Sequence, residues 1–148
     1  MIPVPTLKYL IANKVKDARV LLQNKRCPAA IYIAGYAIEL ALKNKICSTL
    51  RFSQGFPETR QELYNYLALI NENNPQPMAL NLGDIRNHDL NRLLFYSGIE
   101  LRIKENYFAE WATVSSWNPE CRYKKTRVFC KRATVYLKAV VKIIKEIN

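Results

Sequence analysis

The fold is decided by one stretch of the sequence, AAIYIAGYAIELALK, which spans Ala29–Lys43. If this stretch is a helix, two of its three faces are apolar. The apolar stripes are Ile31, Gly35, Ile38, Leu42 and Ile46, and Ala30, Ile33, Ala34, Ala37 and Ala41. A helix that is apolar around most of its circumference lies inside a bundle, where alanines and Gly35 allow close approach of its neighbours. We therefore expect this helix at the centre of the protein.

The third face of the same helix is polar, and it consists of Tyr32, Tyr36, Glu39 and Lys43. Glu39 interrupts the apolar run well short of the ~20 residues that a bilayer requires, which excludes a membrane span. Lys43 follows Glu39 by four residues, a spacing at which an acid and a base pair favourably on a helix.

Length and composition indicate one helical domain. The chain has 148 residues, of which 49% are hydrophobic and four are glycine, so it can bury a substantial core and lacks the turn-rich character of an all-β fold. We expect a single domain over residues 1–148.

The positive charge of the chain is concentrated at its two ends. The net charge is +11; residues 1–26 hold six basic residues and one acid, and residues 120–148 hold nine basic residues and two acids. Such a distribution suits an anionic partner, nucleic acid before membrane, because the basic residues are spread along helices instead of massed in a tail. The alternative is that they form the solvated faces of two amphipathic helices.

The cysteines and the single histidine do not predict a metal site. Cys27, Cys47, Cys121 and Cys130 show none of the close spacings that zinc sites use, and His88 is distant from all four. The first residues lack the basic start and apolar segment of a signal peptide, so we expect a cytoplasmic protein with reduced thiols, without metal or cofactor.

Helical periodicity and breakers divide the chain into successive helices. We expect helices at about 6–22, capped by Thr6, at about 28–50, 58–70, 87–97, 100–117 and 124–147, with Phe129 on the apolar face of the last. The polar segment 71–77 is expected to be a mobile surface loop. The connections are short, which predicts an all-α, antiparallel up-and-down bundle of about four long helices with one or two short ones.

Three segments together resemble the HEPN family of helical domains. They are Tyr32–Lys43, His88–Leu90 with the leucines after it, and Trp117–Tyr123, and they occur in the family's order. The resemblance implies a compact helical bundle, a homodimer, and work on RNA or nucleotides. It also implies a place in toxin–antitoxin or phage-defence systems, in which members are metal-independent ribonucleases or partners of nucleotidyltransferase proteins.

The usual catalytic motif of the family is an arginine, four to six residues, and a histidine, and this chain departs from it. For His88 the arginine would stand at position 81, 82 or 83, which hold Asn81, Leu82 and Gly83. One hypothesis keeps the ribonuclease in altered form, with His88 as acid or base and Arg86, Arg92 or Arg122 as the phosphate-binding cation. The structural alternative is that His88 caps a turn or bonds Asp89.

Glu39 has a similar pair of interpretations. A buried carboxylate needs a partner, for which Lys43, Arg122, Tyr123 and a backbone donor are the candidates. In the structural interpretation, Glu39 anchors the Trp117–Tyr123 turn on the bundle. Alternatively, Tyr36, Glu39, His88 and Arg122 line a small pocket for a nucleotide or RNA base, with Lys43, Asp89, Trp117 and Tyr123 as further binding candidates. A third possibility is an inert interaction module that binds a partner protein.

Overall fold

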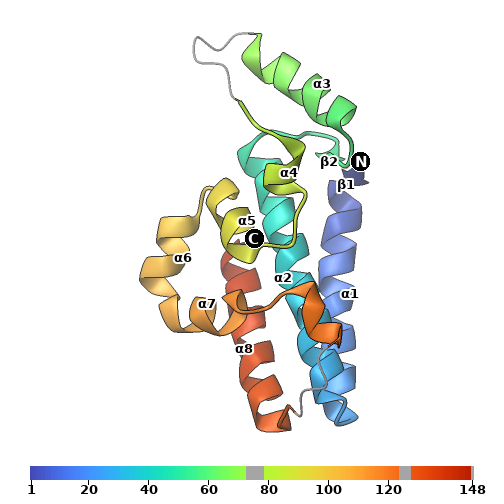
Figure 1. The fold of residues 1–148 in the computed structure, drawn as a ribbon, viewed down its shortest axis with the longest axis vertical. Helices are drawn as coiled ribbons and strands as arrows, with labels where there is room; N and C mark the ends of the chain where they lie inside the picture. Colours follow the sequence, from blue (N-terminus) through green and yellow to red (C-terminus); the bar gives the residue numbers. More distant parts are fainter. Residues whose placement is uncertain (73–78, 124–127, 148) are drawn as a thin grey trace.

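The structure is a computed structural model that describes residues 1–72, 79–123 and 128–147, and only the backbone of Arg122. Within these residues the chain is all-α, as predicted, with α-helices, one 3₁₀ helix and a short two-stranded ribbon (Figure 1). The helices are α1 (Val4–Gln23), α2 (Cys27–Thr49), α3 (Arg60–Asn71), α4 (Leu82–Ile85), α5 (Leu90–Tyr96), α6 (Glu100–Asn106), α7 (Phe108–Ser115), η1 (Pro119–Tyr123) and α8 (Cys130–Ile147). The ribbon pairs β1 (Ile2–Pro3) antiparallel with β2 (Gly55–Phe56).

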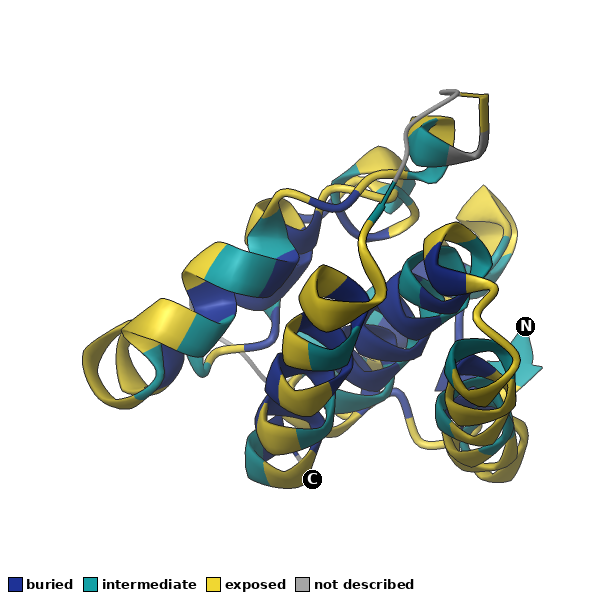
Figure 2. Cartoon of the chain, turned by 90° about the horizontal axis from the view of Figure 1, so that it is seen from below, coloured by how far each residue is buried: buried dark blue, intermediate teal, exposed yellow. Residues whose placement is uncertain are grey.

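Helix α2 lies at the centre of the molecule, as its apolar stripes predict. Helices α1 and α8 pack along it, and α5 and η1 contact it as well (Figure 1). Every member of the two predicted stripes is buried except Ile31 and Ile33, which are half-buried. The buried sides of the long helices face one another in the view along the bundle (Figure 2).

Gly35 makes room for a tryptophan side chain, whereas we expected it to allow close approach of a neighbouring helix. A Cβ atom at this position would lie 2.1 Å from Nε1 of Trp117, so the indole ring occupies the space that the glycine leaves open. The residue therefore admits the segment between α7 and η1, and not the backbone of another helix, to the surface of α2.

Several helix boundaries differ from the sequence expectation. Helix α1 begins at Val4 with a proline in its first turn, so Thr6 lies inside the helix and does not cap it. Helix α3 begins at Arg60, after Thr59, which forms a capping box with Glu62. The expected loop at 71–77 falls largely on residues 73–78, which lie outside the described part of the chain.

The later helices are shorter than expected. The predicted helix at 100–117 is divided at Tyr107, whose φ of −135° ends α6 before α7 begins. Helix α8 begins at Cys130 instead of near residue 124, which leaves Phe129 ahead of the helix and 83% exposed. The prediction that Phe129 belongs to the apolar face was wrong.

Two of the cysteines form a disulfide, which corrects the expectation of reduced thiols. Cys27 and Cys130 are joined across 103 residues of sequence, with their Cα atoms 5.3 Å apart. They are the first residues of α2 and α8, and the fold brings these two helix starts to the same end of the bundle (Figure 1). Only this three-dimensional arrangement makes them neighbours, so their sequence spacing gave no sign of the bond.

Among the described residues, no helix is both long and apolar enough to cross a membrane.

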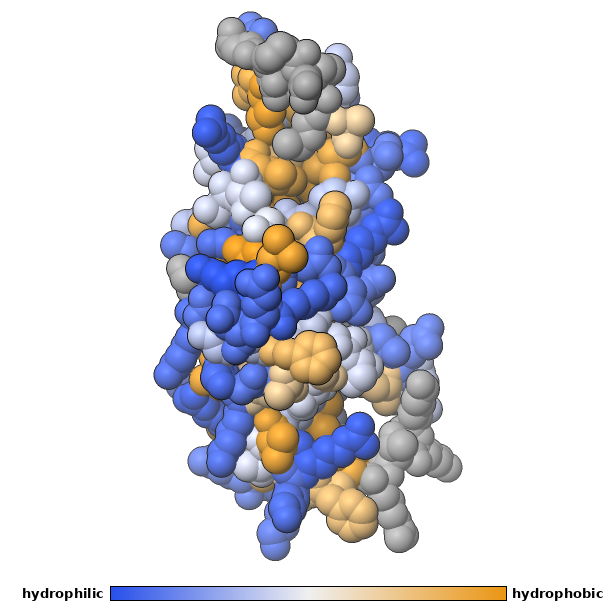
Figure 3. Space-filling view, turned by 90° about the vertical axis from the view of Figure 1, so that its left-hand side faces the viewer, coloured by the Kyte–Doolittle hydropathy of each residue, from blue (hydrophilic) through white to orange (hydrophobic). Residues whose placement is uncertain are grey.

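On the side of the molecule that carries α6 and α7, apolar side chains occur in patches separated by hydrophilic ones (Figure 3).

We predict that the Cys27–Cys130 bond contributes strongly to stability. Closing a loop of this length restricts the unfolded chain, so Cys130→Ser is expected to lower the free energy of unfolding by about 2–4 kcal/mol in urea denaturation. A reducing agent should lower the stability of the wild-type protein to the same level and leave the variant unchanged. Equal stability of the oxidised wild type and the variant would contradict this assignment.

Candidate functional site around Glu39

The candidate site is organised by the carboxylate of Glu39, which is only 3% exposed. Its Oε1 atom lies 2.6 Å from Nζ of Lys43, and its Oε2 atom lies 2.8 Å from Nδ1 of His88. Lys43 is buried too, with Nζ 5.5 Å from the centre of the Phe56 ring. Because an isolated carboxylate is very costly to bury, the two bonds explain how the core of α2 tolerates an acid.

The three residues come together from two parts of the chain. Lys43 lies one turn after Glu39 on α2, whereas His88 lies in the connection between α4 and α5. That connection is held by its own side chains: Asp89 caps α5 by accepting from the backbone N–H groups of Asn91 and Arg92, and Asn87 accepts from the N–H of Asp89. This local framework fixes the position of His88 opposite Glu39.

The bond to Glu39 determines how His88 can act. An ionised carboxylate can only accept a hydrogen bond. Nδ1 of the imidazole is therefore assigned the N–H group and donates a hydrogen bond to Oε2. In the neutral ring, Nε2 is then left as a proton acceptor. The side chain of His88 is 55% exposed, so the ring is anchored at a buried carboxylate and still reaches solvent. This combination suits transfer of a proton to or from a bound molecule.

His88 opens onto a cleft with a volume of about 590 Å³. The lining comes from three places: Tyr36 on α2, His88–Leu90 at the start of α5, and Ser115–Glu120 between α7 and η1. The ring of Tyr36 stands edge-on to two neighbours, with centroids 5.0 Å from Trp117 and 6.2 Å from His88. The cleft therefore has an aromatic wall beside the imidazole.

The cleft is not cationic in its described part. Its lining contains the carboxylates of Asp89 and Glu120, and no lysine or arginine is among the described side chains there. It also contains Ser115, Ser116 and Asn118, none of which was a predicted site residue. The signal that could have found them is their position at the end of α7, on either side of Trp117.

The structure brings together six of the sequence-predicted residues, namely Tyr36, Glu39, Lys43, His88, Asp89 and Trp117. It does not bring Arg86 to the cleft: this residue follows α4, is exposed, and is not part of the described lining, and its role as a catalytic cation stays a prediction. Arg92 forms an ion pair with Asp84. Tyr123 is 74% exposed and outside the lining. The side chain of Arg122 lies outside the described residues.

The bond of Glu39 to His88 fixes the segment before α5. The expected anchoring of the Trp117–Tyr123 turn through Arg122 falls on a side chain outside the described residues and stays a prediction. Trp117 holds that turn on α2, because it is 5% exposed and lies on Gly35. Because Trp117 is buried, it forms the wall of the cleft and is not available to stack on a ligand.

Comparison of the chain with protein-family models, curated proteins and solved structures gave no significant match.

We predict that replacing Glu39 alone lowers the free energy of unfolding more than replacing both Glu39 and Lys43 does. Glu39→Ala leaves the buried ammonium of Lys43 without its carboxylate, so the free energy of unfolding should fall by about 3–5 kcal/mol. Replacing both residues by methionine removes both charges, and this double variant should recover most of the loss. Urea denaturation followed by circular dichroism measures both. A loss below about 1 kcal/mol in Glu39→Ala would mean that the pair behaves like an exposed one.

Proposed function

We propose that this chain is a HEPN-like domain that binds RNA or a nucleotide in the cleft beside His88, with Nε2 of His88 as a hydrogen-bond acceptor for the bound molecule. The observation that carries the proposal is the hydrogen bond from the exposed imidazole to the buried Glu39 carboxylate. A histidine that must keep one nitrogen protonated and the other available is commonly held against a carboxylate in this way.

The lining of the cleft supports a base or ribose as the bound group. Tyr36 is half-buried and presents an aromatic side chain on which a base can stack. Asp89 and Glu120 can accept hydrogen bonds from the amino groups of a base, and Ser115 and Asn118 can bond a ribose hydroxyl. The same carboxylates repel a phosphate, so the phosphates are expected to lie outside the cleft, toward the basic ends of the chain.

The second candidate function is metal-independent cleavage of RNA, which the Glu39–His88 bond favours. Such cleavage needs a base for the 2′-hydroxyl proton, and Nε2 of His88 fits that role. It also needs a cation for the phosphate, which none of the described side chains in the cleft supplies. Arg122 remains the predicted candidate, contributed by the same chain or by a second copy.

The other expectations stay proposals. A homodimer, a toxin–antitoxin or phage-defence setting and a nucleotidyltransferase-type partner are implied by the family resemblance, and a cytoplasmic location is a separate expectation. An inert interaction module is the competing interpretation, and it differs from the proposed function in having no use for His88.

We predict that His88→Ala weakens binding of a fluorescein-labelled single-stranded RNA by about tenfold, because a base loses its contact with the imidazole. Asn65→Ala, an exposed change on α3, should bind as the wild type does. Affinity should also fall with rising salt if the basic helices contact phosphates. If cleavage occurs in EDTA, His88→Ala should reduce its rate by about 10²–10⁴-fold.

The result that rejects the proposal is equal RNA and nucleotide affinity of His88→Ala and wild type, together with equal or absent cleavage by both. Binding without cleavage would support the first candidate and reject the second. Circular dichroism of each variant shows whether a loss reflects the site or the fold.

A further inference from the structure

We propose that a groove between α1 and α8 is the docking site for an acidic amphipathic helix of a partner protein. This groove shares no lining residue with the His88 cleft, and the inference does not depend on the function proposed there.

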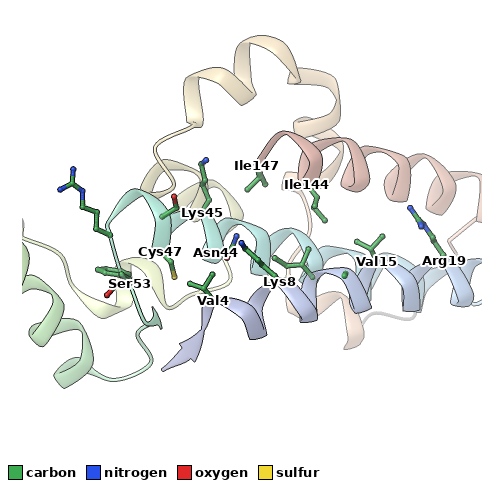
Figure 4. Close-up of a pocket in the computed structure, with 15 residues that line it drawn as sticks. Val4, Lys8, Val15, Arg19, Asn44, Lys45, Cys47, Ser53, Ile144 and Ile147 are labelled. Carbon is green, nitrogen blue, oxygen red and sulfur yellow. The ribbon is translucent and has the colours of Figure 1, made fainter.

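The groove is formed by the three long helices. The C-terminal part of α2 lies at its base, and α1 and α8 form its two sides (Figure 4). Its larger part has a volume of about 1010 Å³. A second hollow of about 460 Å³ continues between the same two helices, and Arg19 lines both. The two parts together form an elongated depression along the bundle, which suits an extended or helical segment better than a compact small molecule.

The apolar surface that the groove presents comes from half-buried side chains. They are Val4 and Val15 on α1 in the larger part, and Leu22 and Val141 in the second hollow. The side chains of Ile11, Leu137, Ile144 and Ile147 also line the two parts, but they are at most 8% exposed and belong to the core beneath them. Apolar surface of this kind binds the apolar face of a helix, with anchors spaced by three and four residues.

The charged residues around this apolar surface are all basic. The larger part is lined by Lys8, Arg19, Lys45 and Arg51, and the second hollow adds Lys138, Lys142 and Lys145, while no aspartate or glutamate is among the described residues that line either part. Within the described chain, Lys142 alone among these seven has an ion pair, with Glu110. The charge pattern therefore selects an occupant that is acidic along the edges of its apolar face.

The chemistry of the groove favours a protein helix over RNA. Recognition of single-stranded RNA depends on aromatic side chains that stack on bases, and Phe52, the aromatic residue among the described lining residues, is 1% exposed. A second copy of this chain is disfavoured in the groove itself, because its segments 1–26 and 120–148 are basic as well and the groove selects an acidic occupant.

The test uses three synthetic peptides of about 18 residues, each labelled with fluorescein. The first is an acidic amphipathic helix of leucine, alanine and glutamate; the second has the same composition in scrambled order; the third has lysine in place of glutamate. Binding to the full-length protein is measured by fluorescence anisotropy, with a labelled single-stranded RNA as a fourth probe. A photo-reactive group on the first peptide maps its position on the wild-type protein.

The matched variants reverse two charges each on α1. Lys8→Glu with Arg19→Glu changes the groove, and Lys14→Glu with Lys16→Glu changes residues of the same helix that do not line it. The first peptide should bind more tightly than the other two, crosslink to α1 and α8, and lose about tenfold or more in affinity in the groove variant alone.

Three results would overturn the proposal. The first is that the acidic amphipathic peptide binds no more tightly than the other two. The second is an equal loss of affinity for this peptide in both variants, which would mean that net charge alone determines binding, and the third is a crosslink outside the groove. Loss of RNA binding without loss of peptide binding in the groove variant would assign the surface to RNA instead. The crosslink is made on wild-type protein, so the test holds even if a variant fails to fold.

Discussion

The buried carboxylate of Glu39 is the constraint on which the arrangement of the site depends. It lies on the central helix, two of whose three faces are apolar, and it is satisfied by Lys43 on one oxygen and by His88 on the other. The first bond is local, between residues one turn apart. The second is long-range and fixes the connection between α4 and α5 against α2. The acid in the core thus links the packing of the bundle to the position of the one histidine.

The same helix serves two surfaces with different properties. Toward Tyr36 and His88, α2 contributes to a small cleft with aromatic and acidic lining. Toward Asn44 and Lys45, it forms the base of a longer groove with apolar and basic lining. The first surface is suited to recognition of a base and to proton transfer, and the second to a protein helix. None of the described lining residues belongs to both surfaces.

The sequence was sufficient to predict the elements whose signals are local. The apolar stripes of α2 predicted its central position, because a 3.6-residue period depends only on neighbouring residues. The spacing of Glu39 and Lys43 predicted their pair for the same reason. Convergence of Glu39 with Tyr36 and His88 was among the alternatives that the sequence allowed, since a buried acid requires a partner.

Other features depend on the tertiary arrangement and could not be read from the sequence. Cys27 and Cys130 become neighbours only when α2 and α8 begin at the same end of the bundle. The break at Tyr107 occurs inside a segment with helical periodicity, so the periodicity alone gave no sign of it. Arg86 was close to His88 in sequence but ends α4 outside the cleft. The groove between α1 and α8 is likewise created by the packing of helices that are distant in sequence.

The central claim, that Glu39 fixes the proton of the imidazole, can be tested by one measurement. His88 is the only histidine, so ¹⁵N labelling of histidine gives an NMR spectrum of this residue alone. At a pH where the ring is neutral, we predict that Nδ1 is protonated and Nε2 is not, and that Glu39→Gln removes this preference. A ring protonated mainly at Nε2 in the wild-type protein, or a spectrum unchanged by Glu39→Gln, would contradict the account.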